Sequence, residues 1–220
     1  MAVAVCTNAS ETDTVPLWFT GKNAHPRCLN NINIQHLGCQ YYANKKAWMA
    51  GELFQEWLRW FGKYIGTEWE VVSILDNFSG HELGSDICDI PANIRIEYLP
   101  PNTKSKLQPC DQGFIQTLKA HTKRAILRNL LDFIEKYPTL ESRQYHTKKG
   151  DLKTHKFAPD VHNAMIFMTS AWQTATTATI QNCFRKAGIH YEDPGLLAFS
   201  DPLMEVTEIL DVVKVDMARI

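Results

Sequence analysis

A mostly apolar run at residues 70–76 constrains the fold of this chain more than any other segment. Its sequence, EVVSILD, has the length of one strand and ends abruptly on Asp76. Runs of this kind are typical of strands buried on both faces, which occur in parallel or mixed sheets covered by helices. A second strand is predicted at 94–99, where apolar and polar residues alternate before two prolines. The sequence therefore predicts an α/β fold with a mixed sheet flanked by helices.

The remaining segments predict a short hairpin, several helices and two loops. Strands are expected at 3–6 and 17–20, because polar, turn-forming residues separate these two apolar runs. Loops are expected at 21–44 and 138–158, which lack regular periodicity. Helices are expected at 46–65, 112–136, 159–173, 177–187 and, in the acidic tail, near 202–216.

Composition excludes several classes of protein. The net charge is −1, but the last 29 residues hold seven acids and two bases, which leaves 21 bases and 17 acids in the preceding 191. This distribution excludes a histone-like binder and permits a locally basic face. The six cysteines and eight histidines form no zinc motif, and no phosphate-binding glycine loop is present. No apolar run approaches the ~20 residues of a membrane span, and the N-terminus lacks a secretion signal, so we expect an intracellular protein.

Two acids stand out by their positions. Asp76 ends a strand expected to be central, and Asp111 lies just before the longest predicted helix. Functional groups of α/β sheets gather at strand ends, and two carboxylates converging there would hold a hard divalent cation for phosphoryl transfer. The alternative is that Asp76 forms a turn and Asp111 caps a helix, and spacing alone favours this alternative.

Six sequence blocks between residues 5 and 190 add to this evidence. The most specific is LPPNTKSKLQP at 99–109, followed by DQG at 111–113. The others are VCTNA at 5–9, LWFTGK at 17–22 with PRC at 26–28, YYANKKAWM at 41–49, LDN at 75–77 with His81, and IQNCFRKAG at 180–188. In these blocks the chain resembles the DDE-type transposases of the mariner/pogo superfamily, in particular the pogo/Tigger branch, which is related to centromere-protein-B-like and jerky-like proteins.

This resemblance implies an RNase H-like fold in which three acids bind two Mg²⁺ or Mn²⁺ ions and cut or join DNA strands. Asp76 matches the second acid, and Asp111, 35 positions later, matches the third, so both are candidate catalytic residues and metal ligands. Asn77 and His81 would line the wall of the site. Cys110 stands where the family usually has leucine, which is a departure from the pattern.

The family's first acid belongs to a strand upstream of the one predicted at 3–6. We therefore expect an N-terminally truncated chain whose first, central strand is missing, with a partial RNase H-like DDE domain at 1–137 and a polar loop, helical extension and acidic tail at 138–220. Unpaired backbone groups beside the missing strand would cost ~1–3 kcal/mol each. The hypothesis is that this polypeptide alone is not catalytically competent. The alternatives are a domesticated, non-enzymatic nuclear DNA-binding protein and a truncated gene model whose true product is a full transposase.

Basic residues cluster around Asp111 and along the helix that follows it. An exposed, solvated helix face is one interpretation, and contact with DNA phosphates is the interpretation that the resemblance favours. The partner implied is the DNA phosphate backbone in the nucleus, with no membrane contact, and a homodimer stays open. The candidate DNA-binding residues are Lys104, Lys106, Lys119, Lys123, Arg124 and Arg128.

Overall fold

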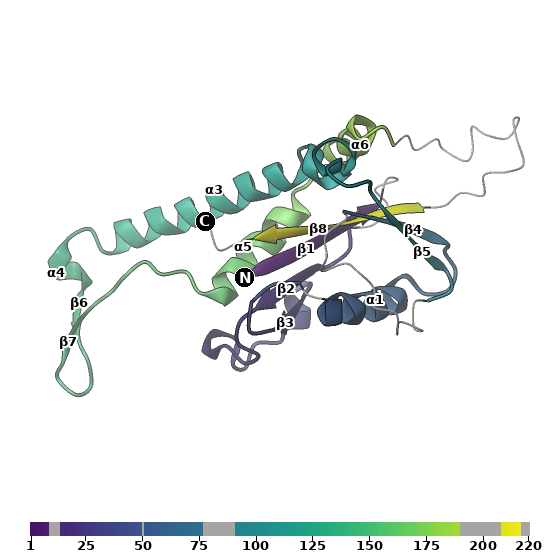
Figure 1. Cartoon of the computed structure of the whole chain (residues 1–220). Coiled ribbons are helices and arrows are strands. Elements are labelled where there is room, and N and C mark those ends of the chain that lie inside the picture. The colour runs from purple at the N-terminus through teal and green to yellow at the C-terminus, as the bar shows by residue number, and fades with distance from the viewer. Residues whose placement is uncertain (9–13, 50, 77–90, 190–207, 217–220) are drawn as a thin grey trace, which may run out of the picture.

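Six strands form one mixed sheet in the order β3-β2-β1-β8-β4-β5 (Figure 1). The structure is a computed structural model that describes residues 1–8, 14–49, 51–76, 91–189 and, by backbone alone, 208–216. The strands are β1 (Ala2–Asn8), β2 (Leu17–Gly21), β3 (Cys39–Ala43), β4 (Val71–Leu75), β5 (Ile94–Tyr98) and β8 (Glu208–Asp216). The predicted hairpin and the predicted strands at 70–76 and 94–99 are therefore confirmed, as is a mixed α/β architecture.

The centre of the sheet is occupied by β8, from the acidic tail. It runs antiparallel to β1, from Ala2↔Asp216 to Asn8↔Leu210, and parallel to β4, from Val71↔Glu208 to Leu75↔Val212. The prediction of a helix near 202–216 is wrong for 208–216, where five of nine residues are Ile, Leu or Val, a composition that favours strands. The predicted gap at the centre of the sheet is also filled, because β8 pairs with the backbones of β1 and β4.

Helices cover both faces of the sheet, as the apolar run at 70–76 predicts. In the described part of the chain the helices are α1 (Gly51–Ile65), α2 (Lys104–Leu107), α3 (Phe114–Lys136), α4 (Leu140–Arg143), α5 (Val161–Gln173) and α6 (Thr177–Lys186). The 3-10 turns there are η1 (Arg27–Leu29), η2 (Ile34–Leu37) and η4 (Pro109–Gln112). Alternate residues of β1 enter opposite cores: Val3 and Val5 pack with α3, α5 and α6, whereas Ala4 and Cys6 pack with α1 and β4.

The predicted helix at 46–65 begins later than expected. Asn44 explains the difference, because its Oδ1 accepts hydrogen bonds from the backbone N–H groups of Lys46 and Trp48, both at 3.1 Å. Such a side-chain turn competes with helix formation. The other long helices lie where they were predicted, and Gly188 follows α6 at φ 81°, the left-handed conformation of a C-terminal helix cap.

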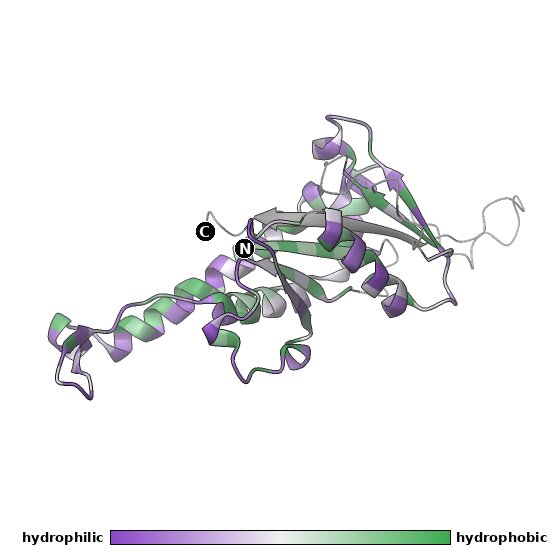
Figure 2. Cartoon of the chain, turned by 60° about the horizontal axis from the view of Figure 1, so that its bottom comes forward, coloured by the Kyte–Doolittle hydropathy of each residue, from purple (hydrophilic) through white to green (hydrophobic). Residues whose placement is uncertain are grey.

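The two predicted loops contain strands. Within 21–44, β3 pairs in parallel with β2, and within 138–158 the strands β6 (Gln144–His146) and β7 (Leu152–Thr154) form an antiparallel hairpin. This hairpin and the last turns of α3 extend away from the sheet, as Figure 2 shows. Both predictions fail because these strands are short and mostly exposed or half-buried, so neither carries a strong apolar signal.

The helices of the predicted C-terminal extension share a core with the sheet. Met165 and Trp172 of α5 and Phe184 of α6 are buried in the same cluster as Val3 and Leu17 of the sheet. The division at residue 137 stays a prediction. Among the described residues, no helix combines the length and apolar character needed to cross a membrane.

Candidate cation and DNA-binding site

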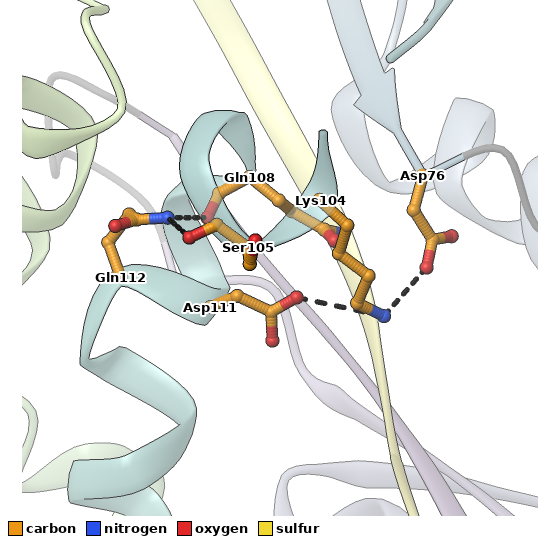
Figure 3. A network of polar contacts seen from close by, with 6 residues as sticks. All are labelled: Asp76, Lys104, Ser105, Gln108, Asp111 and Gln112. Atoms are coloured by element: carbon orange, nitrogen blue, oxygen red, sulfur yellow. Dashed lines mark hydrogen bonds and ion pairs between the residues drawn. The ribbon is translucent and has the colours of Figure 1, made fainter. Parts of the chain in front are cut away.

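The two predicted acids approach the same lysine (Figure 3). Asp76 directly follows β4, Asp111 lies in η4, and Lys104 is the first residue of α2. The Lys104 Nζ atom lies 2.7 Å from Asp76 Oδ2 and 3.6 Å from Asp111 Oδ2. Asp76 and Asp111, 35 positions apart in the sequence, therefore both lie next to the ammonium group of Lys104.

Hydrogen bonds within and next to the LPPNTKSKLQP block fix its geometry. Leu99 N donates to Leu75 O at 2.8 Å, which ties the block to the end of β4. Thr103 Oγ1 donates to Pro100 O at 2.6 Å, and this turn leads directly into α2. Gln112 Nε2 then donates to Ser105 O at 2.9 Å, which joins η4 to α2 (Figure 3). These bonds hold Lys104 and Asp111 on one folded unit.

Gly113 connects η4 to α3, and the backbone conformation at this position requires a glycine. Its φ of 142° and ψ of −23° lie in a region that side chains other than glycine rarely adopt. Gly113 is also the N-cap residue of α3, so the interpretation of Asp111 as the cap of this helix is wrong. The helix is instead anchored by Phe114, which is 1% exposed and meets Trp172 edge-on with ring centroids 4.8 Å apart.

Burial and charge act together on the three groups. The side chains of Asp76, Asp111 and Lys104 are 12%, 24% and 46% exposed. Burial raises the pKa of Asp111; the Lys104 charge opposes this, the Asp76 charge adds to it, and the net pKa is raised. Burial alone would lower the pKa of Lys104, but its hydrogen bond with Asp76 and the charges of both aspartates raise it overall. The lysine therefore stays an ammonium group at neutral pH.

The described side chains supply two carboxylates at this site. Among them, no group of three or more His, Cys, Asp and Glu residues is placed to hold a metal ion. Asp211, on the neighbouring strand β8, stands at the register position of Ile74, two residues before Asp76. The sequence analysis did not place this acid next to β4, because it assigned the tail to a helix. The sequence feature that could have placed it there is the run EILDVVKVD, which is rich in strand-forming residues and contains this acid.

The predicted basic residues fall into two groups. Lys104 lies between the carboxylates, while Lys106, Lys123, Arg124 and Arg128 are exposed and Lys119 is half-buried. Lys119 is close enough for its charge to lower the pKa of Asp111. Along α3, Lys119 and Lys123 are four residues apart, as are Arg124 and Arg128, so each pair lies on one side of the helix. The predicted site-wall residues Asn77 and His81 lie outside the described residues.

A family comparison covers most of this structure. The profile described as DDE superfamily endonuclease matches residues 1–184. The chain belongs to this family. The match includes Asp76, Asp111 and the first eight residues of α6, so the resemblance is confirmed, whereas β8 lies outside it.

Similar proteins carry names that mention ARS binding, a transposable element or the centromere. ARS-binding protein 1 of Schizosaccharomyces pombe is 27% identical, over 86% of this chain and 34% of its own length. Tigger transposable element-derived protein 4 of Mus musculus is 23% identical, over 86% of this chain and 32% of its length. Major centromere autoantigen B of Homo sapiens is 24% identical, over 86% of this chain and 27% of its length. The chain spans about a third of the first of these relatives. No solved structure matches.

Proposed function

We propose that this chain is a transposon-derived, RNase H-like DDE domain that binds DNA phosphates in the nucleus, with Asp76 and Asp111 holding a divalent cation. The observation that carries the proposal is the convergence of these two family acids on one positive charge, at 2.7 and 3.6 Å. A site that already draws an ammonium between two carboxylates suits a hard cation such as Mg²⁺ or Mn²⁺.

Asp76 and Asp111 would be the ligands of that cation, and their roles differ. Asp76 is rigidly placed, because it follows a strand paired on both sides. Asp111 is placed by η4 and by the anchoring of Phe114 beneath it. The bound cation would supply charge neutralisation and activation of a water or hydroxyl at a phosphate.

DNA binding without strand cleavage is the activity that the described side chains favour. Two divalent cations carry four positive charges, and Asp76 and Asp111 balance two of them. A two-metal reaction therefore lacks part of its ligand set among the described side chains. We propose that the chain alone binds DNA without cutting it. Incubation with supercoiled plasmid and Mn²⁺ tests it: nicking that disappears in Asp76→Asn would overturn the hypothesis.

The exposed bases of α3 are the proposed phosphate contacts. Lys123, Arg124 and Arg128 lie on a helix that starts beside Asp111, so a DNA strand at the carboxylates would continue along this face. Contacts of this kind give an affinity that is independent of sequence and falls with salt.

Fluorescence anisotropy with a labelled DNA duplex tests this proposal. Between about 50 and 200 mM salt, log affinity should fall linearly with log salt, by a slope of about 0.9 for each neutralised phosphate. In the double variant Lys123→Gln, Arg124→Gln, the magnitude of this slope should be smaller by up to about 2. Lys63→Gln, on the exposed side of α1, is the matched control and should behave as the wild type. An affinity that does not change with salt would refute phosphate contact.

A further inference from the structure

Lys104 lies where the proposed function places a divalent cation. Its Nζ atom is 2.7 Å from Asp76 Oδ2 and 3.6 Å from Asp111 Oδ2, and Figure 3 shows it between the two carboxylates. We propose that Lys104 is a tethered cation that competes with divalent metal for Asp76 and Asp111 and so lowers the metal affinity of this pair. This inference rests on the proposed function, because it assumes that the pair binds metal.

The competition follows from shared oxygen atoms. Mg²⁺ binds carboxylate oxygens at about 2.0–2.1 Å, and a charge-assisted hydrogen bond from an ammonium spans about 2.7–2.9 Å. The lysine uses Oδ2 of Asp76 and approaches Oδ2 of Asp111, so a metal that bridges the pair would meet the ammonium at both atoms. Two positive groups in one small, partly buried site repel each other. The ammonium must therefore move before the metal binds tightly.

The backbone keeps the competitor in place. Lys104 is held at the start of α2 by the Thr103 turn, and Gln108 N donates to Lys104 O at 3.1 Å. A charged group fixed next to its partners has a high effective concentration, which strengthens its competition with a metal ion from solution.

The side chain is nevertheless free to leave. It is 46% exposed, which gives the ammonium a path from the carboxylates to solvent without a change in α2. After metal binding, the displaced ammonium would lie in solvent at the edge of the site and be available to a DNA phosphate. This reconciles its position here with the sequence-based assignment of Lys104 as a DNA-binding residue. The exchange would link metal binding to phosphate binding at one residue.

Manganese titration by calorimetry on the purified full chain tests the inference without using activity. Lys104→Gln keeps a similar length and removes the charge, so it should bind Mn²⁺ about tenfold more tightly than the wild type. Lys104→Arg keeps the charge and should bind metal about as weakly as the wild type. Lys63→Gln is the control for a change in overall charge. Unfolding midpoints in urea show whether each variant is folded.

The outcomes separate this inference from the proposed function. If Mn²⁺ binding depends on Asp76 but Lys104→Gln binds no more tightly than wild type, the competition is refuted and the cation site stands. If Asp76→Asn leaves Mn²⁺ binding of both wild type and Lys104→Gln unchanged, the proposed cation site is refuted together with the inference. Tighter binding in Lys104→Gln that Asp76→Asn abolishes supports both.

Discussion

Replacing Val212 with proline tests whether β8 holds the sheet together. Val212 is in register with Cys6 of β1 on one side and with Leu75 of β4 on the other. Proline has no N–H group and is excluded from the interior of sheets because it removes a ladder hydrogen bond. Val212→Thr keeps the N–H group and the β-branched shape, so it is the matched control.

The expected loss of stability is large because β8 has two partner strands. One buried acceptor left without its hydrogen bond costs about 1–3 kcal/mol. If β8 separates completely, seven register pairs with β1 and five with β4 are lost. At about one hydrogen bond per pair and ~1 kcal/mol for each bond, this is ~12 kcal/mol, comparable with the total stability of ~5–15 kcal/mol that small domains have. We therefore expect Val212→Pro to lose about 3 kcal/mol or more, and deletion of 208–220 to abolish cooperative unfolding.

Urea unfolding followed by tryptophan fluorescence measures the effect. The midpoint should fall strongly for Val212→Pro and much less for Val212→Thr. If Val212→Pro and the deletion both unfold at the wild-type midpoint, β8 is not part of the stable sheet, and the strand order proposed for its centre is refuted.

Three further predictions concern the support of the site. Phe114→Ala should lower stability by about 3–5 kcal/mol in urea unfolding, because it empties a buried position against Trp172; a loss below ~1 kcal/mol would contradict this packing. Gly113→Ala should cost about 1–3 kcal/mol in backbone strain and weaken Mn²⁺ binding by moving Asp111, and an unchanged metal affinity would contradict this. Burial raises the pKa of the Cys183 thiol, so at pH 8 it should react with a thiol reagent more slowly than half-buried Cys28, and equal rates in folded protein would contradict its burial.

The sequence was most informative where signals were local. The apolar run that ends on Asp76 predicted a buried strand correctly because both of its faces are covered. The motif around Asp111 pointed to the second carboxylate. Neither signal revealed the ion pairs of Lys104, which lies 28 residues from Asp76 and meets it only when α2 folds against the end of β4.

Non-local pairing explains the main errors. An acidic tail with scattered apolar residues fits a helix about as well as a strand, and β8 is recognised as a strand only through its pairing with β1 and β4. The same holds for β3, a short strand in an asparagine-rich segment that pairs with β2. Sequence patterns carry little information on such partners.

DNA affinity measured with and without Mg²⁺ in wild type, Asp76→Asn and Asp132→Asn tests the proposed cation site directly. Asp132 is an exposed acid of α3 and controls for the change in charge. In the proposed site, a cation held by Asp76 and Asp111 would join them to a phosphate, so Mg²⁺ should strengthen DNA binding of wild type and Asp132→Asn relative to Asp76→Asn. An equal effect of Mg²⁺ on all three proteins would contradict a cation-dependent DNA site at this carboxylate pair.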